Sequence, residues 1–300
     1  MKTSLGSKVF DTLNYTFLAL LAFITLFPFW VIMMSSLVDS TEYYSKTFVF
    51  WPSRLNLSAY QYIFGTPWIG TGYKITVQIT VLGTLWGMFL TATAAFAMVN
   101  PNLPGKTFLN WFFIFTMYFG GGLIPSYIIN TKYLGFTDKI SAMWFPGGLG
   151  VWGFLVLRNF FRGIPGDLRE SAMLDGAGEF KILWKIILPL SLPAIATLTL
   201  FNAVGMWNSW QGALYYINTN DKQPLQMILR KMVLTNEGEG NAAIRDMNLQ
   251  YRQLMGGDAP LFQVAVKNAT ISVAALPIMM LYPFFQKYFA QGVLVGSVKG

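Results

Sequence analysis

Long apolar stretches with few or no charged residues dominate the hydrophobic pattern of the chain. A helix needs about 20 consecutive, mostly apolar residues to cross a lipid bilayer. Six stretches meet this requirement, so the pattern predicts an all-α integral membrane protein with six transmembrane helices. The predicted spans cover residues 12–38, 75–100, 107–130, 140–160, 190–217 and 265–288.

A seventh charge-free stretch, Leu55–Tyr73, has a different composition. Its polar residues, Pro67 and three glycines favour an aqueous-side loop with a short helix around Ser58–Phe64. A re-entrant segment is the alternative interpretation. The chain shows no internal repeat and no attached soluble domain, so we expect residues 1–300 to form a single transmembrane domain.

The composition agrees with a lipid environment. Hydrophobic residues make up 54% of the chain and charged residues 11%, whereas a soluble domain carries about 25% charged residues. Cysteine and histidine are absent, which excludes disulfides, the usual zinc sites and histidine acid–base catalysis. The net charge is +8, but no basic run occurs, so we expect neither a metal site nor a nucleic-acid partner.

The distribution of Lys and Arg predicts the orientation of the spans. Cytoplasmic loops carry an excess of these residues. The loop at 158–189 alone carries Arg158, Arg162, Arg169, Lys181 and Lys185. We therefore expect both termini in the cytoplasm, an uncleaved first span, and outer loops at 39–74 and 218–264. Four lysines oppose this orientation because they would flank spans on the outer side: Lys74, Lys132, Lys139 and Lys267.

Three glycine-containing patterns in the chain could indicate a nucleotide site or a break in a helix. Gly148–Gly153 matches G-x-G-x-x-G but lies inside a predicted span, where glycines favour close helix packing. Pro104–Thr107 resembles the end of a phosphate-binding loop but lacks the preceding glycine and strand, so we expect no ATP site on this chain. Gly120–Gly122, followed by Pro125, predicts a kink in the third span, and a hinge is the sharper alternative.

The segment between the fourth and fifth spans predicts two short helices joined by a bend. Pro165 suits the first turn of a helix, and Asp167 and Glu170 stabilise the N-terminal end of that helix. Gly176 lets the chain turn before a second helix over 179–188. The bend is slim enough to enter a groove on a partner protein. The alternative is an amphipathic helix that rests on lipid headgroups.

This segment resembles the EAA loop of binding-protein-dependent ABC importer permeases. The matching residues are Glu170-Ser171-Ala172, Gly176 and Ile186-x-Leu188-Pro189. Ser171 stands where the family has alanine. Four further segments resemble the carbohydrate branch, in particular the second permease of polysaccharide-type importers: Gly122–Tyr127, Asp175–Ala177, Trp207–Asn208 and Gln291–Gly300. The resemblance covers most of residues 12–300.

The resemblance implies the type I ABC importer permease fold with a cytoplasmic coupling helix. It implies an importer that also contains a sister permease, two ATPase subunits that bind ATP and Mg²⁺, and an extracytoplasmic solute-binding protein. The chain would perform no catalysis and hold no cofactor, and would form half of the pathway for an oligosaccharide across a prokaryotic cell membrane. The residues implied in ATPase coupling are Glu170, Ser171, Ala172, Met173, Asp175, Gly176 and Ala177.

Polar and aromatic residues within the spans are candidates for the substrate pathway, because sugars stack on aromatic rings and hydrogen-bond to polar groups. These candidates are Gln78, Asn202, Trp207, Asn208, Trp210, Gln211 and Asn268. The alternatives are helix–helix hydrogen bonds and, for the tryptophans, an aromatic belt at the membrane interface. The outer segment 218–267 is predicted to dock the solute-binding protein, with a solvated loop as its alternative.

Three rival functions fit the sequence less well. A secondary transporter usually has more spans or inverted repeats together with intramembrane carboxylates, and no predicted span holds an acidic residue. A membrane-embedded enzyme would need clustered acidic, His or Cys residues, which the sequence does not offer. An ABC permease for a solute other than a sugar is the nearest alternative, and only the resemblance of Asp175–Ala177 to the carbohydrate branch argues against it.

Overall fold

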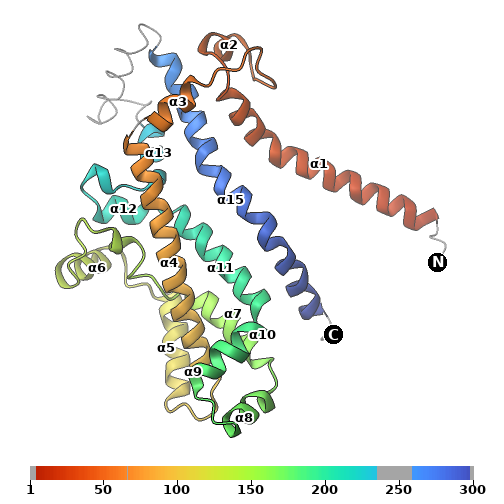
Figure 1. Cartoon of the computed structure of the whole chain (residues 1–300), viewed down its shortest axis with the longest axis vertical. Coiled ribbons are helices and arrows are strands. Elements are labelled where there is room, and N and C mark those ends of the chain that lie inside the picture. The colour runs from red at the N-terminus through yellow and green to blue at the C-terminus, as the bar shows by residue number, and fades with distance from the viewer. Residues whose placement is uncertain (1–4, 66, 235–258, 298–300) are drawn as a thin grey trace. The chain divides into compact units, whose positions relative to one another are not determined.

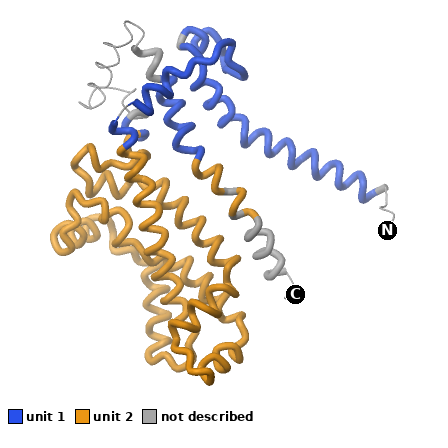
Figure 2. The backbone as a smooth tube through the Cα atoms, in the orientation of Figure 1, with its two compact units in different colours: residues 1–70, 229–276 blue, residues 71–228, 277–300 orange. Residues whose placement is uncertain are grey.

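The computed structural model describes residues 5–65, 67–234 and 259–297. Within these ranges the regular structure is helical and contains no strand, as the apolar pattern predicts (Figure 1). The chain divides into two compact units, residues 1–70 with 229–276 and residues 71–228 with 277–300 (Figure 2). Helices α4 (Pro67–Val99), α13 (Leu225–Leu234) and α15 (Ala259–Ser297) pass from one unit into the other.

The helices of the first unit are α1 (Leu5–Ser35), α2 (Ser40–Ser45), α3 (Ser58–Gly65) and the first part of α15 (Ala259–Ser297). The start of α4 and the end of α13 also belong to this unit. The core at the end of α1 is small, with Met34, Val38 and Val49 buried against Trp30 and Tyr43. Helix α3 is the short helix that the sequence predicts around Ser58–Phe64.

The second unit is built around α4 (Pro67–Val99), α7 (Val151–Arg162) and α11 (Leu192–Trp207). Its other elements, in chain order, are α5 (Lys106–Tyr118), α6 (Leu123–Ile128), the π-turn η1 (Ile129–Tyr133), the 3-10 turn η2 (Ile140–Met143), α8 (Gly166–Leu174), α9 (Glu179–Ile182), the π-turn η3 (Leu183–Ile187), α10 (Leu188–Leu190), α12 (Gln211–Tyr216), the 3-10 turn η4 (Asn220–Lys222) and α13 (Leu225–Leu234). All of these helices are short compared with α4.

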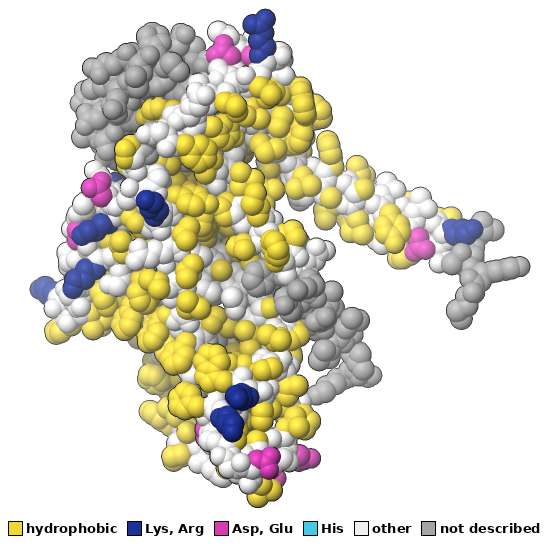
Figure 3. All heavy atoms as spheres, viewed as in Figure 1, with side chains coloured by type: hydrophobic (Ala, Val, Ile, Leu, Met, Phe, Trp, Pro, Cys, Tyr) yellow, Lys and Arg dark blue, Asp and Glu magenta, His cyan; other side chains and the backbone are white. Residues whose placement is uncertain are grey.

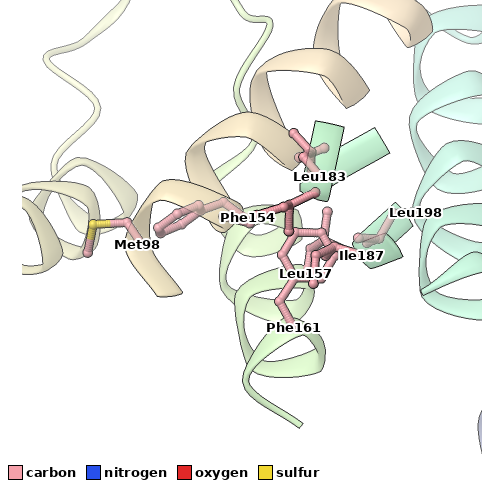
Figure 4. Close-up of a cluster of buried hydrophobic side chains, with 10 residues drawn as sticks. Met98, Phe154, Leu157, Phe161, Leu183, Ile187 and Leu198 are labelled. Carbon is pink, nitrogen blue, oxygen red and sulfur yellow. The ribbon is translucent and has the colours of Figure 1, made fainter. Parts of the chain in front are cut away.

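Two apolar cores hold the second unit together. The main core joins α4, α7, α9, η3 and α11 (Figure 4). Its members are Ala92, Ala95, Met98, Phe154, Leu157, Phe161, Ile182, Leu183, Ile187 and Leu198. A second core joins α4 to η2, α12 and α13, through Ile75, Ile79, Met143, Ala213, Ile217 and Met227. Helix α4 contributes to both cores and therefore organises the unit.

Among the described residues, three helices are long and apolar enough to cross a membrane: Gly6–Ser35, Pro67–Val99 and Val264–Leu281. Two bent helix pairs also qualify if each pair counts as one span. These pairs are Lys106–Tyr118 with Leu123–Tyr133, bent by 108°, and Glu179–Leu190 with Leu192–Trp207, bent by 88°. The described residues therefore offer three to five crossing elements, and the six-span topology stays a prediction.

The predicted fourth span, 140–160, is not one continuous helix. It consists of η2, an irregular segment, and α7, whose 12 residues rise by about 18 Å at 1.5 Å per residue. The hydrocarbon core of a bilayer is about 30 Å thick. Pro146, Gly147 and Gly150 lie in the irregular segment and explain why the helix begins only at Val151.

Helix α4 begins at Pro67, well before residue 75, so the expectation of a loop through Tyr73 is wrong at this point. Proline suits the first turn of a helix because its fixed φ is already helical. Gly72 serves close packing and not a turn. A Cβ placed on it would lie 2.4 Å from Ile228 Cδ1 and 3.2 Å from the Gln223 carbonyl oxygen.

The predicted third span breaks where the sequence predicts a kink. Helix α5 ends at Tyr118, and Gly121 and Gly122 follow with φ angles of 68° and 91°, which side-chain-bearing residues rarely adopt. The chain then continues in α6, strongly bent relative to α5. The role of this break as a hinge stays a prediction.

Large apolar side chains lie exposed over much of the visible face of the molecule (Figure 3). Leu85 on α4 and Phe108 on α5 are 65% and 72% exposed, respectively. In the apolar window of α1 only 6% of the residues are buried. Exposed apolar surface on this scale indicates contact with lipid or with other membrane helices.

Candidate functional site

The segment between α7 and α9 forms a tight turn that projects from the second unit, where α8 is drawn in Figure 1. Helix α8 begins at Gly166, so Pro165 lies directly before the helix and not in its first turn. Asp167 lies in the first turn of α8, where a carboxylate interacts favourably with the helix dipole. We refer to residues 166–178 as the α8 turn.

The end of α8 has the hydrogen-bond pattern of a Schellman motif. The Ala177 N–H donates to the Ala172 carbonyl at 2.9 Å, and the Gly176 N–H donates to the Met173 carbonyl at 3.0 Å. Gly176 has a φ of 73°, in the left-handed region that this motif requires and that glycine adopts without strain. Gly176 is therefore the residue that allows the chain to reverse here.

The α8 turn is fastened to the rest of the second unit from the inside. Ala172 and Ala177 are half-buried, and both pack against the main core together with Ile164. Ala172 and Ala177 occupy the two positions of a Schellman motif at which apolar residues frequently occur. Arg169 donates two hydrogen bonds to the carboxylate of Glu179, which ties α8 to α9.

The outer face of the α8 turn carries the other predicted coupling residues. Glu170, Ser171, Met173 and Asp175 are exposed, and so is Gly176. Leu174, which is not among the predicted coupling residues, is 89% exposed at the tip of the turn. The structure thus brings all seven predicted residues onto one turn, with two alanines facing inward and the others facing outward.

The predicted substrate-pathway residues do not form one cluster. Trp207 is buried, with its ring 5.6 Å from that of Tyr73, and Trp210 packs against the second core. Asn202 is half-buried beside Gly87, and its Oδ1 atom is buried without a hydrogen-bond partner. In this structure the two tryptophans pack within the second unit, and their role in the substrate pathway, like that of Asn202, stays a prediction.

The remaining pathway candidates are more accessible. Gln78 and Gln211 are exposed on α4 and α12. Asn208 is exposed and donates from Nδ2 to the Val204 carbonyl at 3.0 Å, at the C-terminal end of α11. Asn268 lies in the first unit, half-buried on α15. Of the predicted docking segment 218–267, residues 235–258 lie outside the described residues.

A polar clamp surrounds Asp138, and the sequence pattern did not predict it. The Asp138 carboxylate accepts hydrogen bonds from the Asn218 and Thr219 amides, both at 3.0 Å, and from Lys222 Nζ at 2.7 Å. Lys222 first, and the Thr219 amide next, hold the pKa of Asp138 well below its usual range. Asp138 is also the non-glycine residue with a positive φ, 53°, among the described residues. The position of Asp138, a single acidic residue between two apolar stretches, is the sequence feature from which the clamp could have been predicted.

Comparison with known proteins identifies the family. No protein-family model matches the chain. The Bacillus subtilis (strain 168) protein named "Polygalacturonan/rhamnogalacturonan transport system permease protein YtcP" is 40% identical over 294 residues, which cover 98% of this chain and 99% of the relative. The chain belongs to the family of carbohydrate ABC transporter permeases.

Two further comparisons agree with this assignment. "Protein LplC" of Bacillus subtilis (strain 168) is 38% identical to this permease over 300 residues, which cover 100% of this chain and 98% of the relative. A solved structure, described as a bacterial ABC transporter involved in the import of the acidic polysaccharide alginate, matches with a TM-score of 0.82 and 27% identity, covering 96% of this permease and 99% of that chain. The permease is therefore a multi-pass membrane protein of the ABC importer type.

Proposed function

We propose that this permease forms half of the translocation pathway of an ATP-driven importer for oligosaccharides. A sister permease forms the other half, two ATPase subunits bind ATP and Mg²⁺, and a solute-binding protein delivers the sugar from outside. The observation that carries this proposal is the α8 turn. It combines a fixed backbone, an exposed tip and the sequence of the EAA loop.

Contacts within the second unit support the proposed topology of six spans. Leu103, from the loop between the second and third spans, packs against the same core as Ala172 of the α8 turn. Asp138 contacts Thr219, so the loop after the third span meets the loop after the fifth. In a six-span topology the first pair of loops is cytoplasmic and the second pair is on the outside. Both pairings agree with this arrangement.

The mechanism proposed for the α8 turn is mechanical. ATP binding draws the two ATPase subunits together, and a groove on each of them carries a coupling helix with it. Glu170 and Asp175 offer fixed charges to such a groove, and the exposed Leu174 offers an apolar contact. The two inward alanines pass the displacement to the main core and hence to α7 and α11. The permease then alternates between two packings of similar free energy.

We propose acidic oligosaccharides as the substrate class. The name of one relative includes polygalacturonan, which is a polymer of a sugar acid, and the solved relative imports an acidic polysaccharide. Lys74, Lys132 and Lys139 are exposed at the outer ends of predicted spans. Cations at this position attract an anionic sugar and raise its local concentration at the pathway. Gln78, Asn208 and Gln211 offer accessible polar groups for its hydroxyls.

The coupling role is tested by the substitution Gly176→Pro. Proline requires a φ near −65°, whereas residue 176 has a φ of 73°, so the turn cannot keep its shape. We expect the variant to insert into the membrane and the ATPase to hydrolyse ATP, while sugar uptake is lost. Gly178→Ala is the matched control, because the φ at Gly178 is −72°. Normal uptake by the proline variant contradicts the proposal.

The substrate class is tested by competition in reconstituted vesicles that contain the complete importer. We expect short oligogalacturonates to be taken up and to inhibit each other's uptake. Neutral oligosaccharides of the same length should leave this uptake unchanged. Replacing Lys74 and Lys139 by glutamine should lower the uptake rate most at low salt, because screening weakens electrostatic attraction. Equal uptake of neutral and acidic oligomers would contradict an acidic substrate without affecting the coupling role.

A further inference from the structure

A buried cation lies where the sequence pattern predicts an exposed one. Arg158 is one of the five basic residues expected at the cytoplasmic surface, yet only 8% of its surface is exposed to solvent. Within the part of the chain that the structure describes, no carboxylate lies within salt-bridge distance of it. A charge buried without an opposite charge is costly, and in membrane proteins such residues usually have a function.

Arg158 connects α7 to α5. Its Nη1 donates a hydrogen bond to Oδ1 of Asn110 on α5. Its guanidinium carbon lies 5.6 Å from the ring centroid of Phe154, and Phe154 contacts Phe113 of α5 with ring centroids 4.5 Å apart. The Nε atom is buried and has no hydrogen-bond partner. One polar bridge, next to an aromatic pair, thus joins α5 to α7 beside the apolar packing of Leu109 and Phe113.

The same stretch of α7 supports the α8 turn. Phe154, Leu157 and Phe161 belong to the main core (Figure 4). Ala172 and Ala177 pack against this core. The bridge therefore connects α5 to the turn through contiguous packing. Helix α5 ends directly before the glycine-rich break that precedes α6. If α5 and α7 move as one body, a displacement of α7 moves α5, and with it the start of the glycine-rich break, by the same amount.

We propose that Arg158 and Asn110 are a positioning pair that locks α5 to the coupling loop, so that the third span follows the α8 turn during the transport cycle. This inference rests on the coupling role proposed above. Replacing a buried polar pair by apolar side chains of similar volume often leaves stability unchanged or improves it. The pair therefore supplies a fixed geometry between α5 and α7, and its removal should loosen that geometry in a folded protein.

The experiment measures the distance between α5 and the coupling loop in the complete importer. The chain contains no cysteine, so Thr107→Cys on α5 and Lys181→Cys on α9 give the two spin-label sites of this chain, both exposed, in an importer whose other subunits are made free of cysteine. With the native pair, we expect one narrow distance that is the same without nucleotide and after trapping with ATP and vanadate. In the double variant N110L/R158M, we expect a broad distribution that shifts on trapping. Uptake per ATP hydrolysed should fall by about fivefold or more, the lower end of typical coupling between sites.

Controls separate this inference from the proposed function. Arg158→Lys keeps a donor for Asn110 and should restore part of the narrow distribution. If the double variant does not assemble, Asn110→Ala removes the acceptor alone and must show the same broadening. An unchanged narrow distance in these variants, or a shift of the native pair's distance on trapping, overturns the inference. If Gly176→Pro still loses uptake in that case, the coupling role stands and only the Arg158–Asn110 role fails.

Discussion

At the scale of single residues, glycines decide how closely the helices of the second unit approach. A Cβ on Gly87 would lie 2.6 Å from Asn202 Nδ2 and 2.9 Å from the Gly148 carbonyl oxygen. A Cβ on Gly148 would lie 2.5 Å from Nε1 of Trp86, which itself donates to the Phe145 carbonyl at 3.1 Å. Gly148 is the first glycine of the G-x-G-x-x-G pattern. Its role is close packing, as expected from its place in a predicted span.

The substitution Gly87→Ala should therefore destabilise the permease. The added methyl group meets the backbone carbonyl of Gly148, only 2.9 Å from the Cβ position, and overpacking of this kind costs about 1–3 kcal/mol. Gly205→Ala on α11 is the control, because nothing lies within 4 Å of its Cβ position and alanine favours a helix. The measurement is the unfolding midpoint in detergent. Equal midpoints for the two variants would show that the contact at Gly87 is not tight.

At the scale of elements, the Asp138 clamp holds together two connections that lie far apart in the sequence. Asp138 accepts hydrogen bonds from Asn218 and Thr219, and Lys222 Nζ also donates to the Asp138 carbonyl oxygen at 2.9 Å. Its positive φ is tolerated because these bonds fix the residue from several directions. The clamp sets the starting position of the segment that we expect to meet the solute-binding protein.

Asp138→Asn should expose the Asn218 and Thr219 amides to hydrogen exchange. Asp221→Asn, in the same connection, is the control, because Asp221 is exposed.

The lowered pKa of Asp138 in the native chain also predicts a pH dependence. The ionised carboxylate stabilises the native structure fully above the unfolded-state pKa of about 3.9, and this stabilisation is lost as the pH falls towards the native pKa. Protection, corrected for intrinsic exchange, should be constant from pH 8 to 5. A loss of protection near pH 6 would contradict this assignment.

The sequence predicts some elements well and others poorly. Apolar runs predict α1, α4 and α15 because a long helix needs only its own composition, and the glycines at 120–122 predict the break after α5. The EAA resemblance locates the α8 turn. The short length of α7, the packing roles of Trp207 and Trp210, and the burial of Arg158 depend on neighbours that are remote in the sequence. No local pattern contains that information.

At the scale of the whole molecule, the orientation in the membrane is open to a direct test. The chain has no cysteine, so each introduced cysteine reports on one position. Leu174 lies at the exposed tip of the α8 turn, and Thr137 is exposed beside the Asp138 clamp. The proposed topology places these two positions on opposite sides of the membrane.

We expect a membrane-impermeant maleimide to label Thr137→Cys in intact cells and Leu174→Cys only after permeabilisation. The expectation follows from the excess of Lys and Arg in the loop at 158–189 and from the contacts between loops on each side. Labelling of Leu174→Cys in intact cells would remove the ATPase from reach of the α8 turn. The proposed coupling mechanism would then be wrong, whereas the family assignment would stand.

The division of the α8 turn into inward and outward residues separates two kinds of constraint. Ala172 and Ala177 pack inward, while Glu170, Met173, Leu174 and Asp175 are exposed, where the proposed ATPase would bind. Outward residues can therefore be exchanged during evolution without a change in the backbone. A permease of this design can adapt to a different ATPase, or use an ATPase that also serves other transporters, without a change in its sugar pathway.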